Sequence, residues 1–183
     1  MTDAADTSEP APDLKRLAAD VARVALLHGE FVLSSGRRSA YYLDKYRFET
    51  EPALLRAIAR GLAHRLAPDV TRLAGPELGA VALVAALALE TELPFVIVRR
   101  AAKDHGRSRE IEGVLTPGDE VAVVEDVITT GGQALAAAER IQRAGGRVVQ
   151  ILAVVDREEG GRAAIEAAGY RLNSLLQRSD LPG

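Results

Sequence analysis

An apolar run that ends in two carboxylates and a Thr-Gly turn occupies the middle of the sequence. Residues 121–132 read VAVVEDVITTGG. The first four are β-branched or small and show no polar alternation, as in a strand that a parallel sheet covers on both faces. Such strands bind ligands at their carboxyl ends, where Glu125 and Asp126 stand. The segment therefore predicts a central strand over residues 121–125 that leads into a site.

The turn after this strand has the composition of a phosphate loop. Two threonine hydroxyls and two glycines occupy residues 129–132, and apolar spacing from Leu135 predicts a helix over residues 132–144. Free N–H groups and the helix dipole favour an anion at such a helix start. A sugar would explain the adjacent acids, because its hydroxyls can donate to both carboxylates.

This segment resembles the PRPP-binding motif of type I phosphoribosyltransferases. The resemblance implies that the carboxylates bind the ribose and that Asp126 stabilises positive charge at the anomeric carbon. The alternative is an acidic strand end before an ordinary helix start. The implied PRPP-binding residues of this segment are Glu125, Asp126, Val127, Ile128, Thr129, Thr130, Gly131, Gly132 and Gln133.

A basic loop over residues 99–109 reads RRAAKDHGRSR. Charge runs usually form solvated surfaces, but a glycine-containing cationic loop in a compact domain favours ligand binding. The loop is similar to the catalytic loop of orotate phosphoribosyltransferases. That likeness implies that Arg99, Arg100 and Lys103 contact pyrophosphate. His105 would either donate to pyrophosphate or act as an acid-base group near orotate, so Lys103 and His105 join Asp126 as catalytic candidates.

Residues 31–44, FVLSSGRRSAYYLD, predict a hairpin, because two β-like runs flank a Ser/Gly turn. The segment is similar to one that forms part of the pyrimidine pocket in the same family. The likeness implies that Tyr41 and Tyr42 bind orotate together with Thr129. The alternative is that the two tyrosines only pack the hairpin.

Arg157 follows a predicted strand over residues 148–155. By the same resemblance it pairs with the orotate carboxylate, for which a planar guanidinium offers two parallel hydrogen bonds. The alternative is a surface salt bridge. The chain departs from many bacterial relatives at Ser34, where they carry lysine, and in residues 75–79, where it has Glu77 and no base.

Composition fits one cytoplasmic enzyme domain. With 183 residues and 48% hydrophobic side chains, the chain can bury a large core. We expect a disordered tail over residues 1–13 and a single domain over residues 14–183, with an N-terminal helix and hood over about 14–50. Residues 80–89 form the longest apolar stretch, which is too short to span a bilayer. No cysteine is present, and a net charge of −3 with 4% aromatic residues argues against nucleic-acid binding.

The elements alternate as in an α/β fold with a mainly parallel, doubly wound sheet of the type I phosphoribosyltransferase kind. Helices are expected over residues 14–27, 52–66, 80–90, 132–144 and 162–168, and strands over residues 73–75, 95–98, 121–125, 148–155 and 170–176.

The resemblance implies transfer of a 5-phosphoribosyl group from PRPP to orotate, giving orotidine 5′-monophosphate and pyrophosphate in pyrimidine biosynthesis. Mg²⁺ is the expected cofactor, held mainly by substrate and water, so that no dedicated metal ligands are expected. A homodimer is expected, in which each basic loop covers the partner's site. The alternatives are a phosphoribosyltransferase for another base and a PRPP-binding regulator.

Overall fold

A computed structural model of the protein describes residues 10–32, 38–100 and 110–182. Helices and strands alternate along most of the chain, as expected. The helices are α1 (Leu14–Ala25), α2 (Lys45–Glu49), α3 (Pro52–Ala63), α4 (Val81–Thr91), α5 (Gly132–Arg143), α6 (Gly161–Ala167) and the 3-10 turn η1 (Arg178–Asp180). The strands are β1 (Leu26–Val32), β2 (Arg38–Leu43), β3 (Arg72–Pro76), β4 (Phe95–Val98), β5 (Ile111–Glu112), β6 (Glu120–Ile128), β7 (Arg147–Asp156) and β8 (Leu172–Gln177).

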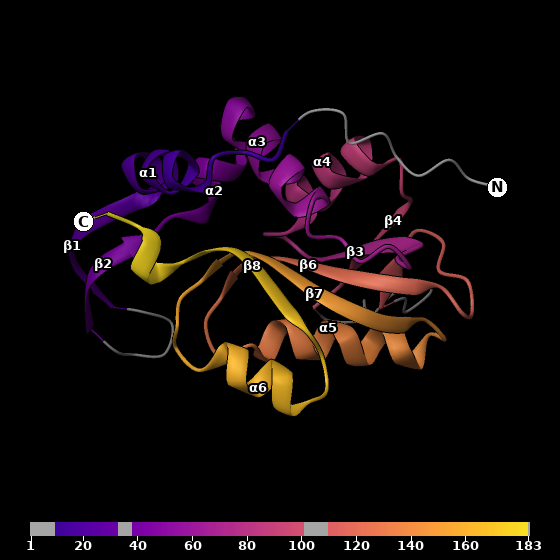
Figure 1. Cartoon of the computed structure of the whole chain (residues 1–183). Coiled ribbons are helices and arrows are strands. Elements are labelled where there is room, and N and C mark those ends of the chain that lie inside the picture. The colour runs from indigo at the N-terminus through magenta and orange to yellow at the C-terminus, as the bar shows by residue number, and fades with distance from the viewer. Residues whose placement is uncertain (1–9, 33–37, 101–109, 183) are drawn as a thin grey trace.

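Six strands form one sheet in the order β5-β4-β3-β6-β7-β8. Neighbouring strands are parallel except β4 and β5, which pair antiparallel at the edge. In Figure 1, α3 and α4 lie on one face of this sheet and α5 and α6 on the other. The mainly parallel, doubly wound α/β fold is therefore confirmed. The strand order reverses between β3 and β6: β4 and β5 continue the sheet beyond β3, and β7 and β8 continue it beyond β6. Such folds bind ligands at this point.

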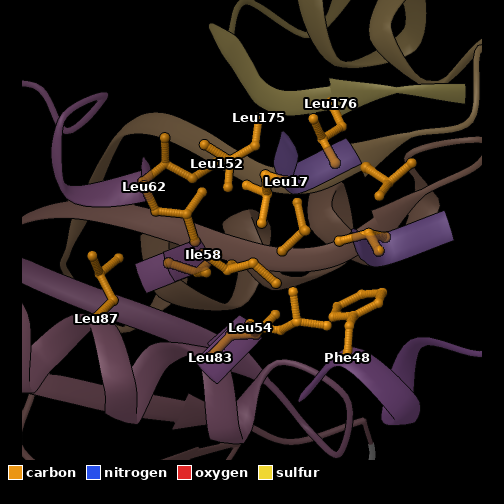
Figure 2. Close-up of a cluster of buried hydrophobic side chains, with 14 of the residues drawn as sticks. Leu17, Phe48, Leu54, Ile58, Leu62, Leu83, Leu87, Leu152, Leu175 and Leu176 are labelled. Carbon is orange, nitrogen blue, oxygen red and sulfur yellow. The ribbon is translucent and has the colours of Figure 1, made fainter. Parts of the chain in front are cut away.

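Side chains of β6 and β7 alternate between two apolar cores. One core joins β-strand residues such as Leu152 to helices α1 to α4, and Figure 2 shows Leu17, Phe48 and Ile58 converging there. The other joins β6 and β7 residues such as Ile151 to α5 and α6. Residues 121 to 126 of β6 are all buried, because helices cover both faces of this central strand.

The predicted hairpin is present as β1 and β2, which pair antiparallel in a separate two-stranded sheet. The predicted first helix extended to residue 27, but α1 ends at Ala25 and the chain continues directly into β1. Likewise the central strand was expected to end at Glu125, but β6 continues to Ile128. The reason is that residues 127 and 128 still pair with β7. Asp126 is therefore fixed within the sheet and not in a loop.

Candidate active site

A cavity of about 480 Å³ opens at the carboxyl end of β6, beside the point where the strand order reverses. Every PRPP-binding residue predicted between Glu125 and Gln133 lines it. The hairpin and α2 close the other side. The remaining lining residues are Tyr42, Leu43, Lys45 and Ala134.

Lys45 forms an ion pair with Asp126 inside this cavity, and its Nζ donates a hydrogen bond to Asp126 Oδ2. Burial lowers the pKa of the Lys45 ammonium group, but the charge and the hydrogen bond of Asp126 outweigh burial and raise that pKa overall. Sequence analysis missed Lys45. The only available signal was a lysine directly after the hairpin, since its partner lies 81 residues away.

Two more carboxyl groups lie in the same cluster. Burial and, next, the negative charge of Asp126 raise the pKa of Glu125 to about 8. The same two causes, in the same order, raise the pKa of Glu49 to about 8, although Lys45 opposes them. Both groups therefore hold a proton at neutral pH, so that Lys45 and Asp126 remain as the charged pair. Glu49 was also missed by sequence analysis.

The turn over residues 75–79 passes directly over this ion pair. A Cβ atom added at Gly79 would overlap Asp126 Oδ2 and Lys45 Nζ, so a larger residue here would displace the ion pair. The peptide between Glu77 and Leu78 is cis. Glu77 Oε1 accepts a hydrogen bond from the backbone N–H of Arg100 at 2.9 Å. It therefore holds the start of the basic loop.

Arg99 and Arg100, to which the resemblance assigns contacts with pyrophosphate, lie close to the end of the phosphate loop. The Arg100 guanidinium donates to Gln133 Oε1 at 3.0 Å, and Arg99 pairs with Glu112 at 3.3 Å. Both arginines line a second cavity of about 330 Å³, next to the first. Gly132 and Gln133 border both cavities, so the two spaces adjoin at the start of α5.

The predicted base-binding residues meet at the hairpin, but the two tyrosines lie in different places. Tyr42 lines the main cavity and contacts the ring of Phe31. Tyr41 instead packs against Arg157, whose Nη2 donates to the Tyr41 hydroxyl at 3.2 Å. Arg157 also pairs with Glu159 at 2.8 Å, and its side chain is only 9% exposed. Its backbone N–H donates to Ile128 O, which places it beside Thr129.

Three residues discussed above lie outside the described part of the chain. They are Ser34, Lys103 and His105. Within the described ranges, no group of three His, Cys, Asp or Glu side chains is arranged to hold a metal ion. No described helix is long and apolar enough to cross a membrane.

Comparison with known proteins agrees with this geometry. The family model of the phosphoribosyl transferase domain matches residues 47–173. The orotate phosphoribosyltransferase of Methanocella arvoryzae is 45% identical over 159 residues, which are 87% of this chain and 91% of that protein. The chain belongs to the orotate phosphoribosyltransferase family. The orotate phosphoribosyltransferase of Natronomonas pharaonis is 48% identical over 157 residues, covering 86% and 90% of the two chains.

Solved structures of the family have the same fold. A crystal structure of Mycobacterium tuberculosis orotate phosphoribosyltransferase with Fe(III) dicitrate matches with a TM-score of 0.84 at 39% identity. It covers 94% of this chain and 100% of that one. A second structure of the same enzyme, in complex with PRPP, matches with a TM-score of 0.80 at 36% identity, over 93% and 99% of the two chains.

Proposed function

We propose that this protein transfers the 5-phosphoribosyl group of PRPP to N1 of orotate, with Mg²⁺, as a step of pyrimidine biosynthesis. The observation that carries the proposal is the cavity in which Asp126 and the phosphate loop face the hairpin. Family membership supports the same reaction, because the relatives that match most of the chain are orotate phosphoribosyltransferases.

The phosphate loop, residues 129–132, supports binding of the 5′-phosphate. Its backbone N–H groups stand at the start of α5, where the helix dipole also favours an anion. The neighbouring carboxyls of Glu125 and Asp126 are placed to accept hydrogen bonds from ribose hydroxyls. These contacts hold the sugar between β6 and the 75–79 turn.

Asp126 supports the chemical step through its charge. When pyrophosphate leaves, positive charge develops on the ribose, and a nearby fixed carboxylate stabilises that charge more than it stabilises the neutral sugar. Asp126 is 3% exposed, so little water screens it. N1 of orotate then forms the new bond to the anomeric carbon and loses its proton, for which the departing pyrophosphate is an acceptor.

The cavity fits Mg²⁺ that arrives with the substrate. Carboxylate oxygens are ligands that Mg²⁺ prefers, and Glu125 Oε1 is buried with no hydrogen-bond partner in the described part of the chain. Because this carboxyl group holds a proton in the free site, it would release that proton on binding the ion. Substrate oxygens and water would supply most ligands. When bound, the ion neutralises charge on departing pyrophosphate.

The basic loop completes the site in this proposal. Arg99 and Arg100 begin it on the pyrophosphate side, and Lys103 and His105 continue it. We propose that the protein is a homodimer in which Lys103 serves the partner's site, since an isologous interface makes both sites composite. We also propose that the enzyme works in the cytoplasm, which cell fractionation with an antibody would test.

A base-consumption assay tests the function. Orotate absorbance should fall only when PRPP and Mg²⁺ are both present, and EDTA should stop the reaction. Equal turnover of uracil would remove the orotate assignment. Binding of PRPP without turnover of any base would favour a PRPP-binding regulator.

A further inference from the structure

The C-terminal turn η1 lies against the base end of the candidate site. Figure 1 shows the yellow C-terminal segment leaving β8 and running back toward β1 and β2. Leu181, just after the turn, is 3% exposed and belongs to the main core. The turn is therefore anchored and not a loose end.

Arg178 in this turn contacts the same tyrosine as Arg157. Its guanidinium carbon lies 4.5 Å from the centre of the Tyr41 ring, and that of Arg157 lies 5.2 Å from it. Arg157 also donates to the Tyr41 hydroxyl at 3.2 Å. The Tyr41 ring thus contacts the guanidinium groups of Arg157 and Arg178, which are 21 residues apart in the sequence.

A second set of contacts connects η1 to Glu158, the residue after Arg157. The backbone N–H of Ser179 donates to Glu158 Oε2 at 2.8 Å, and Ser179 Oγ donates to Glu158 Oε1 at 3.2 Å. The backbone N–H of Glu158 in turn donates to buried Asp156 at 2.9 Å. Glu158 has a φ of 59°, a conformation that needs such support in a residue other than glycine.

We propose that Arg178 and Glu158 are positioning residues that orient Arg157 toward the carboxylate of orotate. This proposal rests on the proposed function. Bidentate recognition of a carboxylate requires a fixed guanidinium plane. Tyr41, which Arg178 contacts in turn, restricts the side chain of Arg157. The contacts between Glu158 and Ser179 restrict the backbone next to Arg157. The turn therefore contributes to base recognition without touching PRPP.

Steady-state kinetics of Arg178→Ala, Arg178→Lys and Ser179→Ala test the proposal, with Arg171→Ala as the matched control. Arg171 is exposed at the start of β8, outside the contacts described above. Arg178→Ala removes the cation–π contact with Tyr41 and also the hydrogen bond from Arg178 Nη1 to Leu181 O. Loss of the contact with Tyr41 should raise the KM for orotate about three- to thirtyfold. The KM for PRPP should change by less than about twofold, because the phosphate loop is untouched. Lysine keeps the charge over the ring and should restore part of the orotate affinity.

Ser179→Ala removes only one hydrogen bond and should raise the orotate KM about two- to fivefold. Melting temperatures are measured for every variant, and assays are run well below the lowest. If Arg178→Ala does not fold, Arg178→Lys and Ser179→Ala decide the question. A parallel rise of both KM values, or no change in either, would overturn the positioning role alone. Failure of the wild-type protein to use orotate would overturn the proposed function as well.

Discussion

Asp126 owes its properties to neighbours from three parts of the chain. Lys45 pairs with it from α2, Gly79 passes over it from the turn after β3, and Glu125 precedes it in β6. In the proposed reaction, this fixed and water-poor setting would make the charge of Asp126 effective in stabilising a cationic ribose.

Asp126→Asn should lower kcat about a hundred- to a thousandfold while raising the KM for PRPP much less. The amide keeps the shape but loses the charge that the cationic ribose requires, and only its oxygen can still accept one of the two hydrogen bonds that Asp126 takes from Lys45 and Val127. Initial rates over a range of PRPP concentrations measure both constants. Asp20→Asn, on the exposed side of α1, is the control. An unchanged kcat with only a higher KM would assign Asp126 to binding alone.

Lys45→Met should lower the free energy of unfolding by about 1–3 kcal/mol, because it leaves Asp126 buried among carboxyl groups without a cation. Urea denaturation at neutral pH measures the change. The double variant Lys45→Met with Asp126→Asn should lose less than the sum of the two single variants. Additive losses would mean that the ion pair contributes no net stability.

The free energy of unfolding should fall as the pH rises from 4.5 to about 8, the range set by the pKa values of Glu49 and Glu125. Their pKa is about 8 in the folded protein against 4.5 as the ordinary value, so the folded state binds more protons between these limits. Each group contributes stability below pH 4.5 that is lost by about pH 8, with a slope of up to about 1.4 kcal/mol per pH unit.

Glu49→Gln should remove one of these two slopes, because glutamine resembles the protonated acid at every pH. Urea denaturation between pH 5.5 and pH 8.5 compares the variant with the wild type and with Glu51→Gln, an exposed neighbour. Equal pH slopes in all three proteins would show that Glu49 is ionised in the folded state at neutral pH.

Sequence analysis found the residues of the site that form local motifs and missed those that do not. The strand, loop and helix over residues 120–143 are continuous, so their pattern could be read directly. Lys45 and Glu49 enter the site only because α2, which packs against α1 and α3, brings them to the carboxyl end of β6. Nothing near them in sequence marks them as partners of Asp126, since their role depends on contacts more than 75 residues apart.

At the scale of elements, the helix α6 supports the phosphate loop through a glycine. A Cβ atom added at Gly161 would overlap the Ile128 side chain, and would lie 2.5 Å from Thr129 O and 3.0 Å from Gly131 N. The close approach of α6 to this loop therefore depends on the absence of a side chain.

Gly161→Ala should raise the KM for PRPP about tenfold or more, because the loop must shift to admit the methyl group. Isothermal titration calorimetry with PRPP and Mg²⁺ measures the affinity for PRPP independently of the kinetics. Gly169→Ala is the control for backbone strain alone: Gly169 follows α6 and has a φ of 86°, which alanine rarely adopts, but nothing lies within 4 Å of an added Cβ. Equal PRPP affinity in both variants would contradict a supporting role for α6.

Most elements were predicted within a few residues, because buried strands and amphipathic helices have clear periodicities. The exceptions have physical reasons. The helix α2 has five residues, too few to show a helical apolar period, and it was not predicted. The two-residue strand β5 is too short for any periodicity, and it exists only by pairing with β4. The boundary between α1 and β1 was misplaced because Leu26 continues the apolar pattern of the helix, although its backbone is already extended.

At the scale of the whole molecule, a subunit-mixing experiment tests whether the basic loop acts between protomers. Lys103→Ala and Asp126→Asn proteins should each be nearly inactive. If Lys103 serves the partner's site, hybrid dimers contain one site with both defects and one with neither. Random exchange of equal amounts should then restore about a quarter of wild-type sites.

Subunit exchange is verified in the same sample by mass spectrometry of differently tagged chains. Dimers that exchange without recovering activity would show that Lys103 serves its own subunit's site or does not act in catalysis. A monomer by analytical ultracentrifugation at assay concentration would also contradict action between protomers.

The position of η1 has a consequence for the order in which the site forms during protein synthesis. The ribosome makes Asp126 and the phosphate loop well before Arg178, and the strands that flank β6 as parallel neighbours are β3 and β7. The sugar-phosphate end can therefore assemble on the growing chain once β7 and α6 have emerged. Under the proposed function, the base end must wait for Arg178 and Ser179, so a nascent chain would be able to bind PRPP before it can select the base.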